Sequence, residues 1–414
     1  MDVAVFHPGT QHSWQTATAL QDLDRLAFYA TSIFYMRDRW PYRGARYLPP
    51  ALRKRVEGEW RRFDHSALDP SLVRTHGLYE WLERGASRAR LRSVAQWLDQ
   101  RGNRQFARSL EQEIRSSRPF ALWGFNNCAL EGFQAARQEG RFTILDRTLG
   151  DWRRYHQLMA PLRETHAEWF LEGDPSGPPH VVARDDAEYD AADLIVCGSR
   201  ICADTILAHS PVKGLERKLQ VLPYCFDQDL FGNVPPPAPV DRAGPVRFLF
   251  VGYAGIRKGI QHVLEAIEQL PSEDAELTIV GQLGIPRKVF ARFEDRVTFL
   301  PSVPRAEIPA IMARHHALVF PSYFEGSALS LLEGLASGLA LIQTPEAGNG
   351  VTEETGILLD RPDTRLTLAA MRALIEDRDR LDHYRASAQA EARNYTFARY
   401  RENISALLDR ELPG

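Results

Sequence analysis

The sequence has few cysteines, no long apolar run and almost no net charge, and each of these absences argues against a class of protein. Its 414 residues include four cysteines without C-x-x-C spacing. We therefore expect buried, reduced thiols in a cytosolic protein rather than a disulfide framework or a zinc site. No stretch has the apolar length of a membrane span, and the N-terminal MDVAVFHPG has the pattern of a strand rather than a signal peptide. The net charge of −3 gives no reason to expect a nucleic-acid partner.

Two ligand motifs are also missing. No G-x-G-x-x-G follows the first strand of either half of the chain, which argues against a dinucleotide cofactor. The letters D-x-D occur at Asp22-Leu23-Asp24 and at Asp377-Arg378-Asp379, but both lie in polar, helix-like surroundings rather than in a strand-end loop. We therefore predict no metal site and no cofactor.

A proline-rich segment divides the chain. Residues 232–245, GNVPPPAPVDRAGP, contain five prolines and several small turn residues. Such a segment is stiff and extended, and a new apolar strand, VRFLFVG, begins directly after it. A long surface loop is the alternative. We predict an N-terminal domain over 1–231, a linker over 232–245 and a C-terminal domain over 246–395. A final amphipathic helix, 396–414, would cross back to the N-terminal domain, with Thr396 as its N-cap.

Both halves alternate apolar strands with helical patterns. In the C-terminal half, VRFLFVG, AELTIVG, RVTFLPS, ALVFPS and LALIQT read as strands, and IQHVLEAIEQL and IPAIMARH as helices. In the N-terminal half, the strands are VAVFHPG, FALWGF, FTILDR, DLIVCGS and LQVLPY. This alternation predicts an α/β protein made of two doubly wound domains that face each other across a cleft.

The stretch FEGSALSLLEGLASG places two glutamates, Glu325 and Glu333, around a strand-to-helix loop. The leucines have helical spacing, and Gly338 stands where a helix C-cap glycine belongs. Ligands of parallel sheets bind beside such loops, where a carboxylate can accept hydrogen bonds from ribose hydroxyls and free amides can meet a phosphate. The alternative is that Glu333 is solvated or paired with an arginine.

A basic pair follows the first strand of the C-terminal half. The loop Gly252-Tyr253-Ala254-Gly255-Ile256-Arg257-Lys258-Gly259 places Arg257 and Lys258 beside glycines at a helix start. Arginine and lysine beside a glycine turn suit a diphosphate. Together with the two glutamates, the pair predicts a site for a nucleoside diphosphate.

These segments resemble one known family. FVGYAGIRKG, LTIVG, VTFLPSV and especially FPSYFEGSALSLLEGLASGLALIQT are similar to the retaining glycosyltransferases of family 4, with their E-x7-E motif. AEYDAADLIVCGSRICADTIL and KLQVLPYCFDQDLF resemble the end of the same family's N-terminal domain. The resemblance implies the GT-B fold, in which two Rossmann-like domains enclose the active site.

The resemblance also implies roles for individual residues. Glu333 would bind the ribose hydroxyls and Glu325 would lie at the transferred sugar. The remaining donor contacts would come from Arg257 and Lys258 at the diphosphate, the backbone of Val303 at the base, the amides of Ser327, Ala328 and Leu329, and the first loop at Gly9 and Thr10. The donor would be a nucleotide diphosphate sugar of the UDP or GDP type, and the acceptor a saccharide or a glycolipid of a bacterial-type glycan. A hexose would be transferred with retention and without a metal.

The chain departs from the family at two positions. Tyr253 stands where an arginine is common, and we expect Arg257 to supply that charge. A histidine that commonly points at the reacting sugar carbon is replaced by Asp146 or Arg147, and Asp146 is our candidate catalytic group. Asn126, Asn127 and His12 are candidates for acceptor contacts.

Residues 37–63 carry nine Lys/Arg and three acids, interleaved with aromatic residues. This pattern fits a peripheral contact with a membrane, on its inner face. It fits equally a charged surface whose aromatic stems pack inward. Two functional alternatives also stay open: a transferase-like subunit without turnover, and a nucleotide-sugar epimerase.

Overall fold

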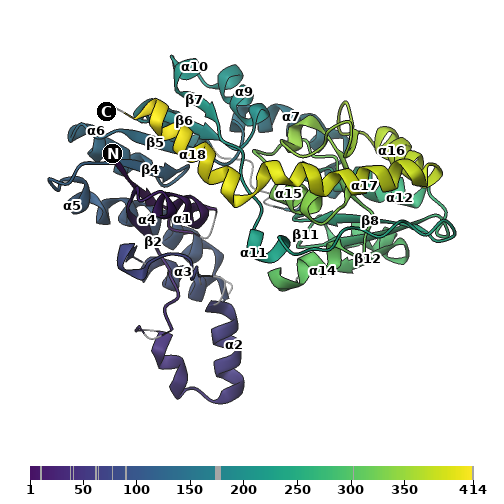
Figure 1. Ribbon diagram of the computed structural model, residues 1–414, viewed down its shortest axis with the longest axis horizontal. Helices are drawn as coiled ribbons and strands as arrows, with labels where there is room; N and C mark the ends of the chain where they lie inside the picture. Colours follow the sequence, from purple (N-terminus) through teal and green to yellow (C-terminus); the bar gives the residue numbers. More distant parts are fainter. Residues whose placement is uncertain are drawn as a thin grey trace.

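The computed structural model describes residues 1–9, 12–37, 39–40, 42–60, 63, 65–76, 78–88, 91–172, 179–301 and 303–412. The chain forms two large parallel β-sheets, each flanked by helices, that follow one another along the long axis of the molecule (Figure 1). The predicted α/β architecture of two doubly wound halves is confirmed. All four cysteines are free and buried, as expected.

The N-terminal sheet has seven parallel strands in the order β3-β2-β1-β4-β5-β6-β7. Five of them coincide with predicted strands: β1 (Asp2–Phe6), β4 (Phe120–Phe125), β5 (Thr143–Arg147), β6 (Leu194–Cys197) and β7 (Leu219–Val221). Sequence reasoning missed β2 (Leu26–Thr31) and β3 (Val73–Thr75). The helices are α1 (Ser13–Asp22), α2 (Pro50–Trp60), α3 (Leu78–Arg88), α4 (Arg92–Ser109), α5 (Glu111–Ile114), α6 (Leu130–Gln138), α7 (Trp152–Thr165), α8 (Pro179–Ala191), α9 (Arg200–His209) and α10 (Leu215–Lys218).

The C-terminal sheet has six parallel strands in the order β12-β10-β8-β13-β14-β15. They are β8 (Val246–Val251), β10 (Ala275–Val280), β12 (Val297–Leu300), β13 (Ala317–Phe320), β14 (Ala340–Gln343) and β15 (Gly356–Leu358), of which only β15 was not predicted. A small pair, β9 (Ala254–Gly255) and β11 (Leu283–Gly284), stands apart. The helices are α11 (Gln228–Phe231), α12 (Ile260–Glu268), α13 (Arg287–Phe290), α14 (Ile308–Met312), α15 (Leu329–Ala336), α16 (Thr364–Glu376), α17 (Arg378–Ala392) and α18 (Phe397–Glu411). The predicted C-cap glycine of α15, Gly338, has the expected positive φ of 72°.

The strand orders locate the ligand edge of each sheet. The chain changes winding direction once in each, between β1 and β4 and between β8 and β13. In open α/β sheets, ligands bind outside the carboxyl ends of the strands at such points. The loops that follow these four strands are therefore the natural walls of a site.

The last helix joins the two halves. Thr396 caps α18 by accepting a hydrogen bond from the Arg399 amide at 3.3 Å, as predicted. The buried side of α18 lies against α1, where the hydroxyls of Tyr400 and Thr16 are 2.8 Å apart. In Figure 1 the yellow helix accordingly leaves the C-terminal half and ends over the N-terminal half.

The proline-rich segment packs along α17 rather than spanning open space. Arg385 donates from Nη1 to the Ala238 carbonyl at 2.7 Å, and the Val240 amide donates to Asp382 at 2.9 Å. The segment 232–245 is thereby attached to the C-terminal half. The chain passes between the halves just before it, after β7.

Residues 37–63 place their aromatic side chains in two environments. Tyr42 and Trp60 turn inward and meet Trp81 of α3. Trp40 and Tyr47 are 63% and 72% exposed, and an arginine guanidinium lies over each ring. Inward packing thus describes part of the segment, and exposed basic and aromatic surface describes the rest.

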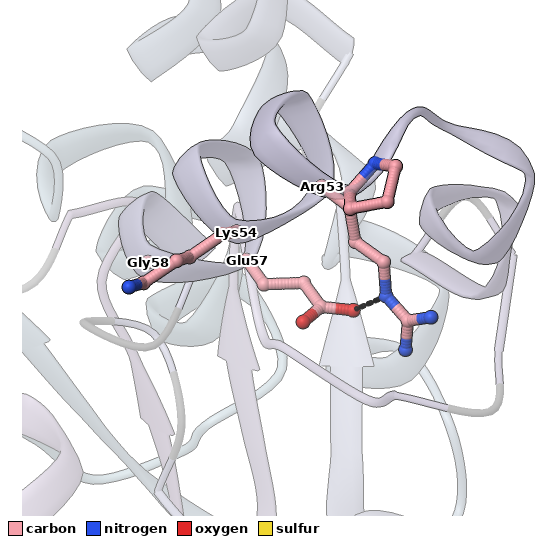
Figure 2. A pocket seen from close by; sticks show the side chains of 5 residues that line it. Arg53, Lys54, Glu57 and Gly58 are labelled. Atoms are coloured by element: carbon pink, nitrogen blue, oxygen red, sulfur yellow. Dashed lines mark hydrogen bonds and ion pairs between the residues drawn. The ribbon is translucent and has the colours of Figure 1, made fainter.

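Helix α2 extends away from both sheets (Figure 1). A hollow of about 390 Å³ runs along it, lined by Pro50, Arg53, Lys54, Glu57 and Gly58 (Figure 2). The ion pair between Arg53 and Glu57, at 2.7 Å, forms part of its wall. The lining residues named all belong to α2, so within the described part of the chain this hollow has no opposing wall of the kind a substrate site needs.

Candidate active site

Two cations and a glutamate meet at the ligand edge of the C-terminal sheet. Gly259 has a φ of +71°, and a Cβ there would lie 1.9 Å from the Pro321 carbonyl oxygen. Glycine therefore permits the loops after β8 and β13 to touch. Their contact brings Arg257 Nη1 to 2.8 Å and Lys258 Nζ to 3.1 Å from the same oxygen, Oε1 of Glu325. The predicted basic pair and the first predicted glutamate form one cluster.

The charges in this cluster support one another. Burial alone would raise the pKa of Glu325, but Lys258 and Arg257 outweigh it and hold that pKa below its ordinary value. Burial lowers the pKa of Lys258, an effect that Glu325 opposes and Arg257 reinforces. With Arg257 and Lys258 protonated and Glu325 ionised, the cluster has a net charge of plus one. Such a site attracts a phosphate anion.

Tyr253 occupies the position where the resemblance led us to expect an arginine. A Cβ on Gly255 or Gly284 would lie 2.7 or 2.4 Å from its ring, so the ring lies directly over the small strands β9 and β11. Arg257, not Tyr253, brings the guanidinium to Glu325. This placement agrees with the expectation that Arg257 supplies the charge.

Glu333 lies on α15, where it is almost fully buried. Its Oε1 accepts a hydrogen bond from Arg305 Nη2 at 2.7 Å. Burial raises the pKa of Glu333, and Arg305 opposes that rise. Pairing with an arginine was the alternative left open by the sequence, and it is present. The pair lies at the same sheet edge as the Glu325 cluster, because α15 follows β13.

The other predicted donor contacts differ in how available they are. The Ala328 amide donates to the Ala347 carbonyl at 3.0 Å, which contradicts its predicted availability to a ligand. The Ser327 hydroxyl is buried and has no hydrogen-bond partner among the described residues, beside the start of α15 at Leu329. Val303 is half-buried in the loop after β12, two residues before Arg305. Ser327, Leu329 and Val303 therefore remain candidates.

Asp146 lies at the end of β5 and is completely buried. Its Oδ2 is 3.2 Å from His12 Nε2 and 3.3 Å from Trp123 Nε1, and its Oδ1 accepts from the Tyr224 hydroxyl at 3.0 Å. These three partners surround the carboxylate, and the catalytic role of Asp146 stays a prediction. His12, at the N-cap of α1, stands between this aspartate and the first loop.

Of the two donor contacts predicted in the first loop, Gly9 lies within the described residues. The Gly9 amide donates to His7 Nδ1 at 3.0 Å. Burial lowers the pKa of His7 to about 4, so the ring is neutral and can accept that bond. Thr10, the other predicted donor contact here, lies outside the described residues.

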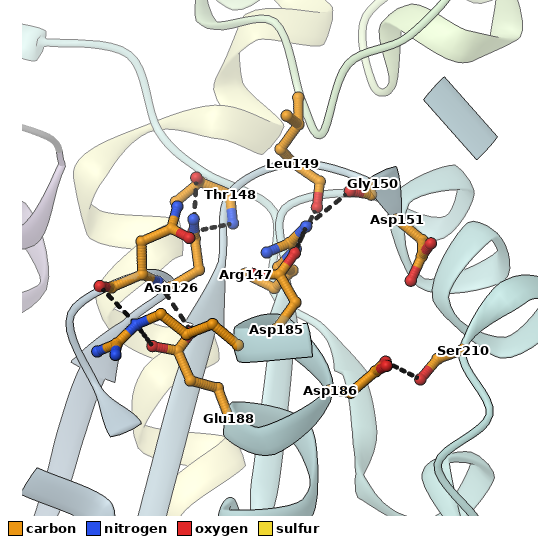
Figure 3. A network of polar contacts seen from close by, with 12 residues as sticks. Asn126, Arg147, Thr148, Leu149, Gly150, Asp151, Asp185, Asp186, Glu188 and Ser210 are labelled. Atoms are coloured by element: carbon orange, nitrogen blue, oxygen red, sulfur yellow. Dashed lines mark hydrogen bonds and ion pairs between the residues drawn. The ribbon is translucent and has the colours of Figure 1, made fainter. Parts of the chain in front are cut away.

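Asn126 and Asn127 follow β4 and are held in place by their neighbours, and Figure 3 shows Asn126 beside Thr148. Oδ1 of Asn126 accepts from the amide and hydroxyl of Thr148, at 3.1 and 2.8 Å. Asn127 has a φ of +69°, and its amide donates to Glu188 at 2.8 Å. Burial raises the pKa of Glu188 to about 7. The backbone amide of Asn127 and the side-chain oxygen of Asn126 are thus used internally, so the side-chain amide nitrogen of Asn126 and the side chain of Asn127 are the candidates for acceptor contacts.

Arg147 shapes the neighbouring loop rather than facing a substrate. It is completely buried, donates to the carbonyls of Leu149 and Gly150 at 2.7 and 2.8 Å, and lies 2.7 Å from Asp185 (Figure 3). Arg147 is therefore engaged within the N-terminal half, and Asp146 stays the predicted polar group in place of a histidine.

The glutamate loop touches the N-terminal half, a contact that the sequence did not reveal. Phe324 packs on Tyr155 and Trp152 of α7, with ring centroids 5.5 and 6.4 Å apart. A Cβ on Gly326 would lie 2.1 Å from the Thr148 carbonyl oxygen, and the Ser199 hydroxyl donates to the Gly326 carbonyl. Glu325 lies between these two contacts, directly beside the other half.

Within the described ranges, no three His, Cys, Asp or Glu side chains gather as a metal site. In the same ranges, no helix is both long and apolar enough to cross a bilayer.

Known proteins that are similar to this chain include glycosyltransferases. Residues 245–377 match the family described as "Glycosyl transferases group 1". The chain is 28% identical over 215 residues to D-rhamnosyltransferase WbpZ of Pseudomonas aeruginosa, covering 46% of this chain and 55% of that protein. It is 25% identical over 163 residues to O-antigen chain mannosyltransferase B of Escherichia coli, covering 36% and 42%. The chain spans about half or less of the length of these curated relatives.

Solved structures match over nearly the whole chain. Anabaena Alr3699/HepE in complex with UDP-glucose superposes with a TM-score of 0.62 at 12% identity, covering 99% of both chains. The lipopolysaccharide outer core galactosyltransferase WaaB superposes with a TM-score of 0.60 at 13% identity, covering all of both. The fold is GT-B. In a GT-B protein the two ligand edges face each other, which is the arrangement of the Glu325 loop and the loops after β4 and β5.

Proposed function

We propose that the protein is a retaining glycosyltransferase that moves a hexose from a UDP- or GDP-type nucleotide sugar to a saccharide or lipid-linked acceptor of a bacterial glycan. The observation that carries this proposal is the meeting of Arg257, Lys258 and Glu325 beside buried Glu333, at the ligand edge of a GT-B fold. The similarity to a rhamnosyltransferase and a mannosyltransferase supports the reaction class.

The cluster suggests how the donor is activated. Arg257 and Lys258 would stabilise the negative charge that develops on the departing nucleoside diphosphate. Glu325 is held ionised by the same cations and would accept hydrogen bonds from hydroxyls of the transferred sugar. Glu333 would accept hydrogen bonds from the ribose. The acceptor hydroxyl would attack the face from which the diphosphate leaves and give its proton to that phosphate.

The N-terminal half would position the acceptor. His12, Asn126 and Asn127 lie at its ligand edge, and Asp146 would act through His12 by fixing the orientation of the imidazole. Residues 37–63 would contact a membrane peripherally through exposed Trp40 and Tyr47 and their stacked arginines. Sedimentation with anionic and neutral vesicles tests that contact, and binding to neither would exclude it.

A transferase-like subunit without turnover is the second candidate. Tyr253 at the expected arginine position and the enclosed Asp146 favour it. An epimerase on the same architecture is a weaker third. Among the described residues, no histidine forms a hydrogen bond or ion pair with Glu325 or Glu333, and the acid–histidine pair of the facing half, Asp146 with His12, is buried.

A ligand screen followed by a turnover assay tests the proposal. Nucleoside diphosphates and their sugars are added in a thermal-shift experiment, in which a ligand at 100 times its Kd adds about 2.7 kcal/mol of stability. Slow hydrolysis of the stabilising nucleotide sugar without acceptor would identify an enzyme. Binding without any hydrolysis or transfer would favour the subunit, and a sugar released as its epimer would identify an epimerase. No stabilisation by any nucleotide would overturn all three.

A further inference from the structure

Arg305 is a solvent-facing arginine attached to the buried carboxylate of the candidate donor site. It begins the turn after β12 and its side chain is 57% exposed, whereas that of Glu333 is 6% exposed. Besides donating to Glu333, it lies 3.7 Å through Nε from Asp227 Oδ2. Asp227 caps α11, just after the chain has crossed from one half to the other. Arg305 thus connects Glu333 to the crossover.

Binding of ribose requires an ionised Glu333, and this requirement suggests a role for Arg305. Ribose hydroxyls donate hydrogen bonds best to an ionised carboxylate, and a carboxyl group without a counter-ion becomes protonated when buried. Over the described residues, the charged groups that act on the Glu333 carboxylate are Arg305, which favours its ionised form, and Asp227, which opposes it. Ribose is neutral and brings no cation of its own. Arg305 uses Oε1, and Oε2 accepts no hydrogen bond from a described residue.

We propose that Arg305 is a positioning residue for the donor: it keeps Glu333 ionised and holds one of its oxygens, so that the other accepts from the hydroxyls of a ribonucleotide. The site would therefore distinguish ribonucleoside diphosphates from analogues without ribose hydroxyls. This inference rests on the proposed function for the identity of the ligand, but its effect on Glu333 exists without any ligand.

Calorimetric titration with UDP and GDP tests it, using the wild type, Arg305→Ala and Arg305→Lys. At pH 7 we expect Arg305→Ala to bind about tenfold more weakly, the effect of one charge-assisted hydrogen bond. Arg305→Lys should retain most of the affinity. Because protonation of Glu333 causes the loss, the ratio of variant to wild-type Kd should fall as the pH is raised from 6 to 9. The 2′,3′-dideoxy diphosphate, which lacks both hydroxyls, should bind the wild type and Arg305→Ala equally.

Arg242 offers a matched control in the same half of the molecule. It is 54% exposed and lies 2.7 Å from Asp379 and 3.1 Å from Asp382, away from the ligand edge. Arg242→Ala should leave nucleotide binding unchanged. Tighter binding by Arg305→Ala would show that the arginine blocks the site, and a loss independent of pH would show that it does not act through Glu333. Either result would overturn the proposal.

The ligand-free protein separates this inference from the proposed function. If the wild type binds neither UDP nor GDP, the proposed function fails. The Glu333 carboxyl signal can still be titrated by carbon-13 NMR, assigned by its loss in Glu333→Gln. A higher midpoint in Arg305→Ala than in the wild type supports the role of Arg305. Equal midpoints overturn it, whichever ligand the protein binds.

Discussion

The two facing edges of the molecule treat their carboxylates differently. On the C-terminal edge, Glu325 is paired with Arg257 and Lys258, and Glu333 is paired with Arg305. On the N-terminal edge, Asp146 lies among His12, Trp123 and Tyr224, without a lysine or arginine among its hydrogen-bond partners. Cations that face a carboxylate can be shared with an incoming phosphate. Three hydrogen-bond partners around buried Asp146 instead hold its carboxylate in one orientation.

This difference indicates a division of labour between the edges. Under the proposed function, the C-terminal edge would supply the charges that bind and activate a nucleotide sugar, and the N-terminal edge would supply the rigidity that orients an acceptor. If so, mutations on the two edges should separate donor binding from turnover. The predictions below test that separation, beginning with the largest effect.

Lys258→Met should have the largest effect on the donor. Its ammonium is close to Glu325 and largely buried, and truncating one member of such a pair typically costs about 2–5 kcal/mol. We expect the affinity for UDP or GDP to fall about a hundredfold, a change that corresponds to about 2.8 kcal/mol. Calorimetry measures it, with Lys288→Met, an exposed lysine on α13 of the same half, as the control. Unchanged affinity would show that Lys258 does not contribute to nucleotide binding.

Asp146→Asn should affect turnover and leave donor binding unchanged. The amide replaces one acceptor oxygen by a donor, so one of the three partners loses its hydrogen bond in a buried place, at a cost of roughly 1–3 kcal/mol. We expect about a thirtyfold loss of turnover, equivalent to about 2 kcal/mol, through a misoriented His12. Tyr224→Phe removes one bond and keeps the carboxylate, so it should lose less. Weaker nucleotide binding by Asp146→Asn would break the proposed division.

Glu333→Ala should moderately weaken binding of the nucleotide donor. Alanine is a good helix former, so α15 should persist. The lost hydrogen bonds to ribose are worth roughly 1.5–3 kcal/mol each when one partner is charged. We expect UDP or GDP to bind at least about tenfold more weakly, measured by calorimetry. Glu307→Ala, an exposed acid in the turn after β12 of the same half, is the control. Equal affinities in both variants would make Glu333 a structural acid only.

The C-terminal edge was predictable because its residues follow strands of one parallel sheet. Arg257, Lys258, Glu325 and Glu333 each lie in or near a loop after β8 or β13, and strand ends of neighbouring strands meet. Arg305 was missed because a single arginine after β12 resembles the many exposed arginines of the chain. Its partner becomes apparent only when the loop after β12 is placed beside α15.

The N-terminal edge was less predictable for a related reason. The partners of Asp146 come from positions 23, 78 and 134 residues away, and no spacing in the sequence connects them. The contacts of Phe324 with α7 cross between the halves, so they too leave no local pattern.

Chelation of metal ions should leave turnover unchanged, which is the smallest of the expected effects. A metal in a sugar-nucleotide enzyme neutralises the diphosphate, and under the proposed function Arg257 and Lys258 would supply that neutralisation here. Glu325 is already paired with both cations, so it is a poor ligand for an added divalent ion. Turnover with a responsive donor should therefore be equal with and without EDTA, and Lys258→Met should not be restored by Mg²⁺. Loss of wild-type turnover on chelation, with recovery on adding Mg²⁺ or Mn²⁺, would mean that a metal, and not this pair of side chains, carries the charge of the leaving group.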